Sequence, residues 1–167
     1  SRKPAAPFIT STLQQDANRK LGLTSRETMS IAQKLYERGF ITYMRTDSTN
    51  LSEQAIKAAR ACVKDLYGKE YLPENPRDYS KKKSKGAQEA HEAIRPAGTD
   101  FPKPADTSLK GTQLALYDLI WKRTVASQMV NSQQKQVSLR FSVGDAIFSA
   151  SGMTIEFPGF LKAYVEG

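Results

Sequence analysis

The chain has 167 residues, 39% of them hydrophobic and 25% charged, which allows one folded domain with part of a second and excludes a disordered basic tail. The 25 Lys and Arg outnumber the 17 Asp and Glu, and the net charge of +8 favours a polyanionic partner such as nucleic acid. A single cysteine, Cys62, excludes a disulfide framework, and the lack of a roughly 20-residue apolar span or an apolar signal segment leads us to expect a cytoplasmic protein.

Three helices are expected in the first part of the chain, because apolar residues recur at helical spacing between polar caps and glycines. They are expected over residues 8–21, from Thr24 to Gly39, and from Asn50 to Gly68. Residues 40–49 lie between the second and third helices. They begin with residues that favour β-strands and end with residues rich in Thr, Ser and Asp. This segment is predicted to be a short strand that runs into a loop.

The middle of the chain is expected to be largely irregular. Residues 69–86 contain two prolines and the lysine-rich run 81–85, which indicates an exposed connection. A short helix is predicted over residues 88–94, and a proline-rich loop follows over 96–106. Regular structure returns in a strongly amphipathic helix predicted over residues 112–129.

Beyond residue 131 the hydrophobic pattern changes from helical to alternating. Apolar and polar residues alternate over 137–143, and further short apolar runs are separated by turn residues. The further runs are residues 147–148, 155–157 and 163–165. The pattern predicts a small antiparallel meander, so the expected fold class is mainly α with a small antiparallel β appendage, an α+β protein.

Several common chemistries lack their motifs in this sequence. There is neither a P-loop nor a G-x-G-x-x-G fingerprint. The single histidine excludes a two-histidine zinc motif, and no Asp-x-Asp pair marks a divalent metal site. We therefore expect this chain to bind no metal.

Tyr43 and Arg45 lie two residues apart in the predicted strand, where an extended backbone points both side chains to one face. A phenol and a guanidinium placed together can engage one phosphate, which is what a tyrosine nucleophile needs. The simpler alternative is a tyrosine that packs its ring beside a solvated arginine, and spacing alone favours that alternative.

The only histidine, His91, precedes Arg95 by one turn of the predicted helix, so both are expected on one face. Such a pair can contact a phosphate oxygen, with His91 able to move a proton. The alternative is a surface histidine between two glutamates. The thiol of Cys62 and the ring of Trp121 are expected to be ordinary core groups.

Three segments, in this order, resemble the core of bacterial DNA topoisomerase I, a type IA enzyme. They are residues 7–15 (PFITSTLQQ), 39–49 (GFITYMRTDST) and 88–96 (QEAHEAIRP). The resemblance implies that residues 8–131 form the domain of the active-site tyrosine, with a CAP-like helix-turn-helix architecture. It also implies that residues 1–7 enter from an adjoining arch domain and that residues 132–167 return to it.

The resemblance further implies roles for single residues. Tyr43 matches the nucleophile that attacks a single-strand phosphodiester and becomes linked to the 5′ phosphate. Arg45 matches the arginine at that phosphate, where its charge stabilises the transition state. His91 matches a histidine close to the bound strand and is expected to contact DNA. Further DNA contacts are expected from Arg95, Ser11 and Thr12.

The family's TOPRIM domain, which supplies the magnesium ligands, has no counterpart in this sequence. Mg²⁺ is therefore expected only in the parent enzyme, and the chain alone is expected to be inactive. The parent is expected to relax negatively supercoiled DNA without ATP, in the cytoplasm at the nucleoid. Single-stranded DNA and the remaining domains of the parent are the expected partners.

Three alternatives remain at this point. The first is a non-catalytic, basic nucleic-acid-binding module in which Tyr43 is structural. The second is a tyrosine recombinase, although such enzymes usually surround their tyrosine with more than one histidine or lysine. The third is an interaction scaffold without affinity for single-stranded DNA.

Overall fold

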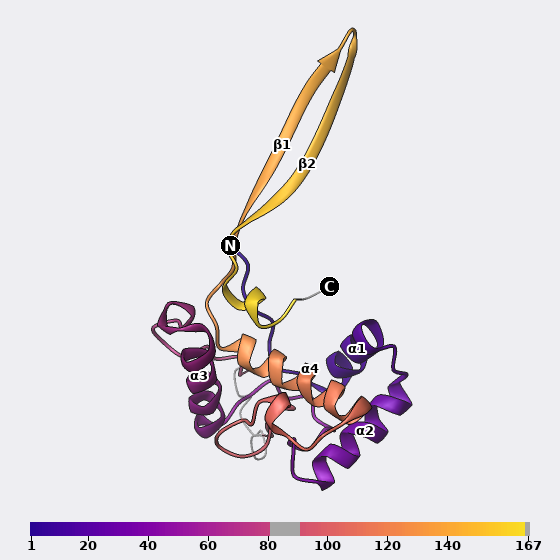
Figure 1. Ribbon diagram of the computed structural model, residues 1–167, viewed down its shortest axis with the longest axis vertical. Helices are drawn as coiled ribbons and strands as arrows, with labels where there is room; N and C mark the ends of the chain where they lie inside the picture. Colours follow the sequence, from indigo (N-terminus) through magenta and orange to yellow (C-terminus); the bar gives the residue numbers. More distant parts are fainter. Residues whose placement is uncertain (81–90, 166–167) are drawn as a thin grey trace, which may run out of the picture.

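A computed structural model describes residues 1–80 and 91–165. Helix α4 (Gly111–Ser127) lies at the centre of a helical body, with α1 (Thr10–Leu21) and α2 (Ser25–Glu37) on one side and α3 (Glu53–Tyr67) on the other (Figure 1). Ten of the 17 residues of α4 are buried, so this helix forms the core against which the other three pack. The short 3₁₀ helices are η1 (Lys69–Tyr71), η2 (Pro104–Asp106) and η3 (Gly159–Lys162).

The helix caps account for where the helices begin. In α2 the expected capping box forms, since Thr24 Oγ1 accepts from the Glu27 amide at 3.1 Å and Glu27 Oε2 accepts from the Thr24 amide at 3.3 Å. The predicted cap of α3 at Asn50 is wrong. Ser52 caps that helix, with its Oγ accepting from the backbone amide of Ala55 at 3.1 Å. Asn50 is engaged elsewhere, because its carbonyl accepts from the amide of residue 93.

A buried polar cluster ties the two ends of the described chain to the helical body. The Arg123 guanidinium donates to the carbonyl of Ala6 at 2.6 Å and lies 3.4 Å from Asp16 Oδ2. The hydroxyl of Tyr164 also donates to Asp16. Because Asp16 and Arg123 are both buried, each needs its partner to offset the loss of hydration.

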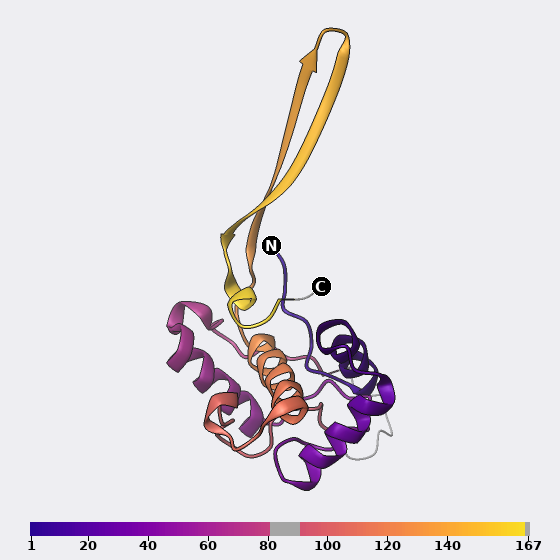
Figure 2. The same cartoon turned by 45° about the vertical axis from the view of Figure 1, so that its right-hand side comes forward.

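The β appendage is one long hairpin and not the predicted meander. Strand β1 (Gln133–Val143) pairs antiparallel with β2 (Ala146–Phe157), and the ribbon projects far from the helical body (Figures 1 and 2). The turn expected at residues 144–145 is present. Gly152 lies between the apolar runs 147–148 and 155–157, where turn residues were predicted, and it instead faces Val137 within the ladder. The fold class, α+β with an antiparallel sheet, is confirmed.

The strand predicted at residues 163–165 is also absent. After β2 the chain turns into η3 and lies against the helical body, where Phe160 and Tyr164 are buried. The apolar character of this run therefore reflects core packing and not pairing in a sheet. The predicted boundary at residue 131, between the tyrosine domain and the returning arch segment, stays a prediction. Residues 158–165, on the arch side of that boundary, pack against the helical body. Within residues 1–80 and 91–165, no helix has the length and apolar character that crossing a bilayer requires.

We predict that Gly159→Ala destabilises the protein by about 3–4 kcal/mol, from backbone strain and overpacking together. Gly159 has φ 51°, and an added Cβ would collide with the Asn131 carbonyl and lie 2.7 Å from the Val130 carbonyl oxygen. Gly144→Ala is the matched control, because Gly144 has φ 60° with nothing within 4 Å of an added Cβ. It should cost only about 1–2 kcal/mol in urea unfolding. Equal losses for the two variants would contradict the close approach at Gly159.

Candidate active site

The segment that carries Tyr43 is held by the first residue of α1. The Thr10 amide donates to the Thr46 carbonyl at 3.0 Å. The Thr10 hydroxyl donates to the Met44 carbonyl at 2.6 Å and accepts from the Thr46 amide at 3.0 Å. These bonds satisfy the amide and the hydroxyl of Thr10 and fix the backbone on either side of Arg45. The loop after the predicted strand is thus anchored to the helical body.

A second set of bonds joins this segment to residues 91–97. The Thr42 amide donates to the Arg95 carbonyl at 2.9 Å, and the Thr42 hydroxyl donates to the Ala93 carbonyl at 2.8 Å. Ile41 forms a single β-bridge with Pro96. The strand predicted at the start of residues 40–49 is therefore reduced to one bridge, since its partner segment is short and contains a proline.

Residues 41–45 do not form a regular strand, because the chain bends at Met44. Ile41 is 2% exposed and Met44 is 1% exposed. Tyr43 is 50% exposed, and Arg45 is exposed as well. The buried residues anchor the segment in the core, so the phenol and the guanidinium are left on the outer surface.

Tyr43 and Arg45 line one open hollow of about 580 Å³, together with His91 and Ser11. These four residues come from three parts of the sequence, and the bonds of Thr10 and Thr42 bring those parts together. The Tyr43 ring packs edge-on against Tyr36, with 5.3 Å between ring centroids. In the described residues no carboxylate forms an ion pair with Arg45. Its guanidinium is therefore available to an anion in the hollow.

Two other residues of the hollow were not singled out in the sequence. Gln14 lies one helical turn beyond Ser11, and Asp47 lies two residues beyond Arg45. Both residues could have been predicted from spacing, because Gln14 follows Ser11 by one turn of a helix and Asp47 follows Arg45 by two residues. Their amide and carboxylate add hydrogen-bonding groups to the rim of the hollow.

Arg95 does not join this group. It is 8% exposed, and its guanidinium donates to Glu92 Oε2 at 2.7 Å and to the carbonyls of Pro96 and Gly98 at 2.9 and 3.1 Å. The predicted helix over 88–94 is wrong for residues 91–94, which form no helix and pair with Phe8 only through a single bridge at Ile94. Residues 88–90 and the lysine run 81–85 lie outside the described residues. His91 and Arg95 therefore do not share a helical face, and Arg95 supports the loop from inside.

Thr12 also lies apart from the hollow around Tyr43. Its hydroxyl accepts from the Ile9 amide at 3.0 Å and so caps the first turn of α1. Thr12 lines a different hollow, beside Asp16 and Arg123. Of the two hydroxyl residues predicted near α1's start, the structure thus brings only Ser11 to Tyr43.

Glu92 supports the site although sequence patterns did not reveal it. Its carboxylate accepts from Arg95 Nε at 2.7 Å and from the backbone amide of Ser52, the cap of α3, at 3.0 Å. Burial alone would raise the pKa of Glu92, but the hydrogen bonds from Arg95 and Ser52 and the charge of Arg95 together hold the pKa below its usual range. Glu92 thereby fixes the segment next to His91 against the start of α3.

The described residues offer no site for a metal ion. In residues 1–80 and 91–165, no three His, Cys, Asp or Glu side chains lie close enough together to hold one. The hollow around Tyr43 contains one carboxylate, that of Asp47, and one imidazole, that of His91. This donor set does not match the oxygen-rich shell that Mg²⁺ prefers.

Comparison with known proteins identifies the family. The family model for DNA topoisomerase matches residues 1–167, so the chain belongs to the DNA topoisomerase family. It is 64% identical over 167 residues to DNA topoisomerase 1 of Synechococcus elongatus and 60% identical over 171 residues to that of Streptomyces coelicolor. These matches cover 100% and 99% of this chain but only 19% and 18% of the relatives.

A solved structure agrees with this assignment. The full-length topoisomerase I from Thermotoga maritima is 40% identical in sequence, with a TM-score of 0.78. The match covers 97% of this chain and 27% of that one. The fold described above is therefore the fold of one part of a much longer topoisomerase, and this chain spans about a fifth of the length of its curated relatives.

We predict that Glu92→Gln lowers the free energy of unfolding by up to about 1 kcal/mol at pH 7, since the side chain is partly solvated. A carboxylate whose pKa is lower in the folded state stabilises the fold above its unfolded pKa of about 4.3, and this contribution disappears as pH falls through the folded pKa. Urea unfolding at pH 7 and pH 3 should show the two proteins converging in acid. A difference that stays constant with pH would contradict the proposed charge interaction.

Proposed function

We propose that this chain is the part of a type IA DNA topoisomerase that carries the nucleophile, Tyr43. The main support is a half-exposed phenol that shares a hollow with the guanidinium of Arg45, which has no ion-pair partner among the described residues, in a chain of the DNA topoisomerase family. The phenol oxygen attacks the phosphorus of one DNA strand, forming an O–P bond as the bond to the 3′ oxygen breaks. A 5′-phosphotyrosine and a free 3′ hydroxyl result, and attack by that hydroxyl reverses the step.

The surrounding residues have distinct roles in this proposal. Arg45 stabilises the charge that develops on the phosphate oxygens in the transition state. His91, exposed at the same hollow, contacts the strand and is placed to exchange the proton that the phenol loses or the 3′ oxygen gains. Ser11 lies in the first turn of α1, where the helix dipole favours a phosphate.

We further propose that the parent protein relaxes negatively supercoiled DNA by strand cleavage, strand passage and religation. The phosphotyrosine conserves the energy of the phosphodiester bond, so the cycle needs no ATP. Mg²⁺ would be held by a TOPRIM domain elsewhere in the parent, because the described residues of this chain do not fit it. Single-stranded DNA and the other domains of the parent are the partners, and the bacterial nucleoid in the cytoplasm is the proposed location.

The hairpin supports the proposed contact with another part of the parent. Alternate residues on one face of the ribbon are apolar and exposed. They include Val137, Leu139, Phe141, Val143 and Phe148. A two-stranded ribbon with such a face is marginally stable in water. We propose that residues 1–7 and 132–167 belong to an arch domain whose remaining strands cover this face.

A non-catalytic nucleic-acid-binding module is the second candidate. The edge contact between Tyr43 and Tyr36 is one that a purely structural tyrosine also makes, and the net charge of +8 would suffice for salt-dependent binding. The two candidates differ in one product, a covalent bond between DNA and position 43.

In the complete topoisomerase, we predict that Tyr43→Phe abolishes the covalent DNA adduct and leaves binding of single-stranded DNA within about twofold of the parent. The substitution removes the attacking oxygen but keeps the ring that packs on Tyr36. A labelled oligonucleotide trapped under denaturing conditions reports the adduct, and fluorescence anisotropy reports binding. An adduct in the Phe variant would rule out Tyr43 as the nucleophile, whereas no adduct in either protein would favour the binding module.

We also predict that the 167-residue chain by itself does not relax a supercoiled plasmid in the presence of Mg²⁺. The described residues hold no metal site, and the hollow at Tyr43 is open to solvent, whereas a strand needs a complete groove to be positioned for reaction. Gel electrophoresis of the plasmid, with the complete enzyme as positive control, measures the outcome. Robust turnover by the chain alone would show that this proposal misplaces the metal chemistry.

A further inference from the structure

A second hollow adjoins the one around Tyr43 and continues along α2. It has a volume of about 460 Å³, and Gln14 and Arg45 line both hollows. The second hollow therefore starts at the residue proposed to hold the reacting phosphate and leads away from it. α1 and α2 lie next to each other on the same side of α4 (Figure 1), and the hollow lies over this pair.

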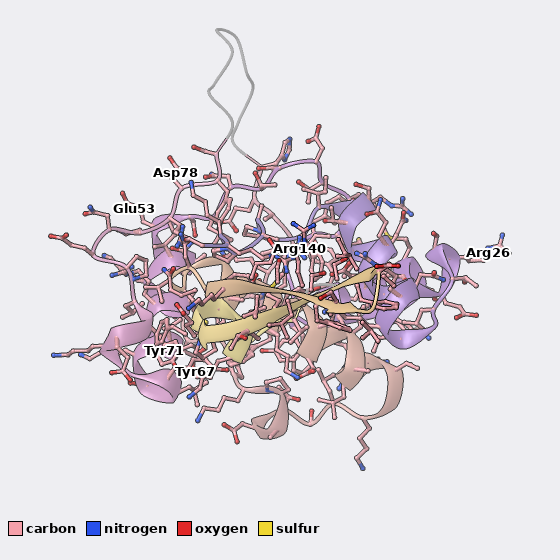
Figure 3. All side chains as sticks on the ribbon, turned by 90° about the horizontal axis from the view of Figure 1, so that it is seen from above. Arg26, Glu53, Tyr67, Tyr71, Asp78 and Arg140 are labelled. Atoms are coloured by element: carbon pink, nitrogen blue, oxygen red, sulfur yellow. The ribbon has the colours of Figure 1, made fainter. Side chains whose placement is uncertain are left out.

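The lining of the second hollow suits an anionic strand. Its residues from α2 are Ser25, Arg26, Met29, Ser30 and Gln33. With Gln14 and Arg45 they include two arginines and no carboxylate. In the described residues Arg26 forms no ion pair, and it stands at the solvent-exposed edge of α2 (Figure 3). A positive charge without a partner at the end of a polar hollow favours a phosphate.

The spacing along α2 offers room for one phosphate and the base beside it. Arg26, Ser30 and Gln33 follow the i, i+4, i+7 pattern of a single helix face, and seven residues of helix extend about 10 Å. Met29, on the same side, offers a polarisable apolar surface to a base. The Gln33 amide donates to Glu37 at 3.0 Å, which holds the side chain in place.

From these observations we infer that the hollow along α2 is a strand-binding subsite for the single-stranded DNA next to the phosphate at Tyr43. Arg26 contacts a neighbouring phosphate, and Met29 and Gln33 contact the base beside it. This inference rests on the proposed function, because the first hollow must hold the reacting phosphate. The subsite is expected to accept any base sequence in the DNA strand, because binding relies on charge and on an apolar surface.

The test uses the complete topoisomerase with Tyr43→Phe, so that binding is measured without cleavage. Arg26→Gln should weaken binding of a labelled single-stranded oligonucleotide about threefold to fivefold at low salt. It should also make the slope of log K against log salt shallower by about 0.7, the value for one phosphate contact on a single strand. Lys57→Gln, which removes the same charge from an exposed position on α3, is the matched control and should change neither quantity.

A series of oligonucleotides lengthened at the 5′ or the 3′ side gives a second readout. The effect of Arg26→Gln should appear only when the oligonucleotide grows on one of the two sides, the side that enters the α2 hollow. Unchanged affinity and slope in Arg26→Gln would overturn the subsite, as would an equal effect of Lys57→Gln. If Tyr43 forms its adduct while Arg26→Gln has no effect, the subsite fails and the proposed function stands. A one-sided effect without any adduct would support strand binding and overturn the proposed cleavage.

Discussion

The hydroxyl of Thr10 is the contact on which the geometry of the site depends. It bonds the backbone on both sides of Arg45, at Met44 and at Thr46, and it does so from the first residue of α1. Because Met44 on one side of Arg45 is buried, fixing those backbone groups also fixes which side chains point outward. Tyr43 and Arg45 face the hollow as a consequence of this anchoring, since Ile41 and Met44 occupy the core.

The site therefore combines a rigid frame with an open surface. Thr42 and Glu92 hold residues 91–97 against the Tyr43 segment and against α3, and the buried pair Asp16–Arg123 holds the chain ends against α1 and α4. All of these polar groups are paired within the protein. Arg26 and Arg45, by contrast, stand at the hollows without a carboxylate partner among the described residues. Charge is thus free at the surface where an anionic strand would lie.

Local patterns in the sequence predicted what depends on neighbours along the chain. The capping box of α2 and the glycine that follows α3 form as expected because a cap is set by residues within one turn. The choice of Ser52 over Asn50 as a cap depends on contacts with Glu92 and Ala93, about 40 positions away. The position of the Arg95 backbone likewise depends on Thr42, which lies 53 positions earlier. Sequence periodicity does not reveal such long-range contacts. The helix predicted around His91 is therefore wrong over residues 91–94, the part that the structure describes.

The hairpin shows the same limit in a different form. Alternating apolar residues predicted strands, and strands form, but the number of turns depended on whether Gly152 would break the ladder or join it. For Tyr43 the spacing indicated a nucleophile and a simpler packing role at once. The spacing could not show that Tyr43 shares a hollow with Arg45, His91 and Ser11, because these residues come from three separate parts of the chain.

The rate of covalent adduct formation in Thr10 variants of the complete topoisomerase tests this account most directly. Thr10→Ser keeps the hydroxyl and should stay within about twofold of the parent, whereas Thr10→Val removes it and should slow adduct formation at least about tenfold by misplacing Tyr43 and Arg45. Circular dichroism establishes that both variants are folded. A folded Thr10→Val variant that forms the adduct as fast as Thr10→Ser would show that this anchor does not position Tyr43 for the proposed attack.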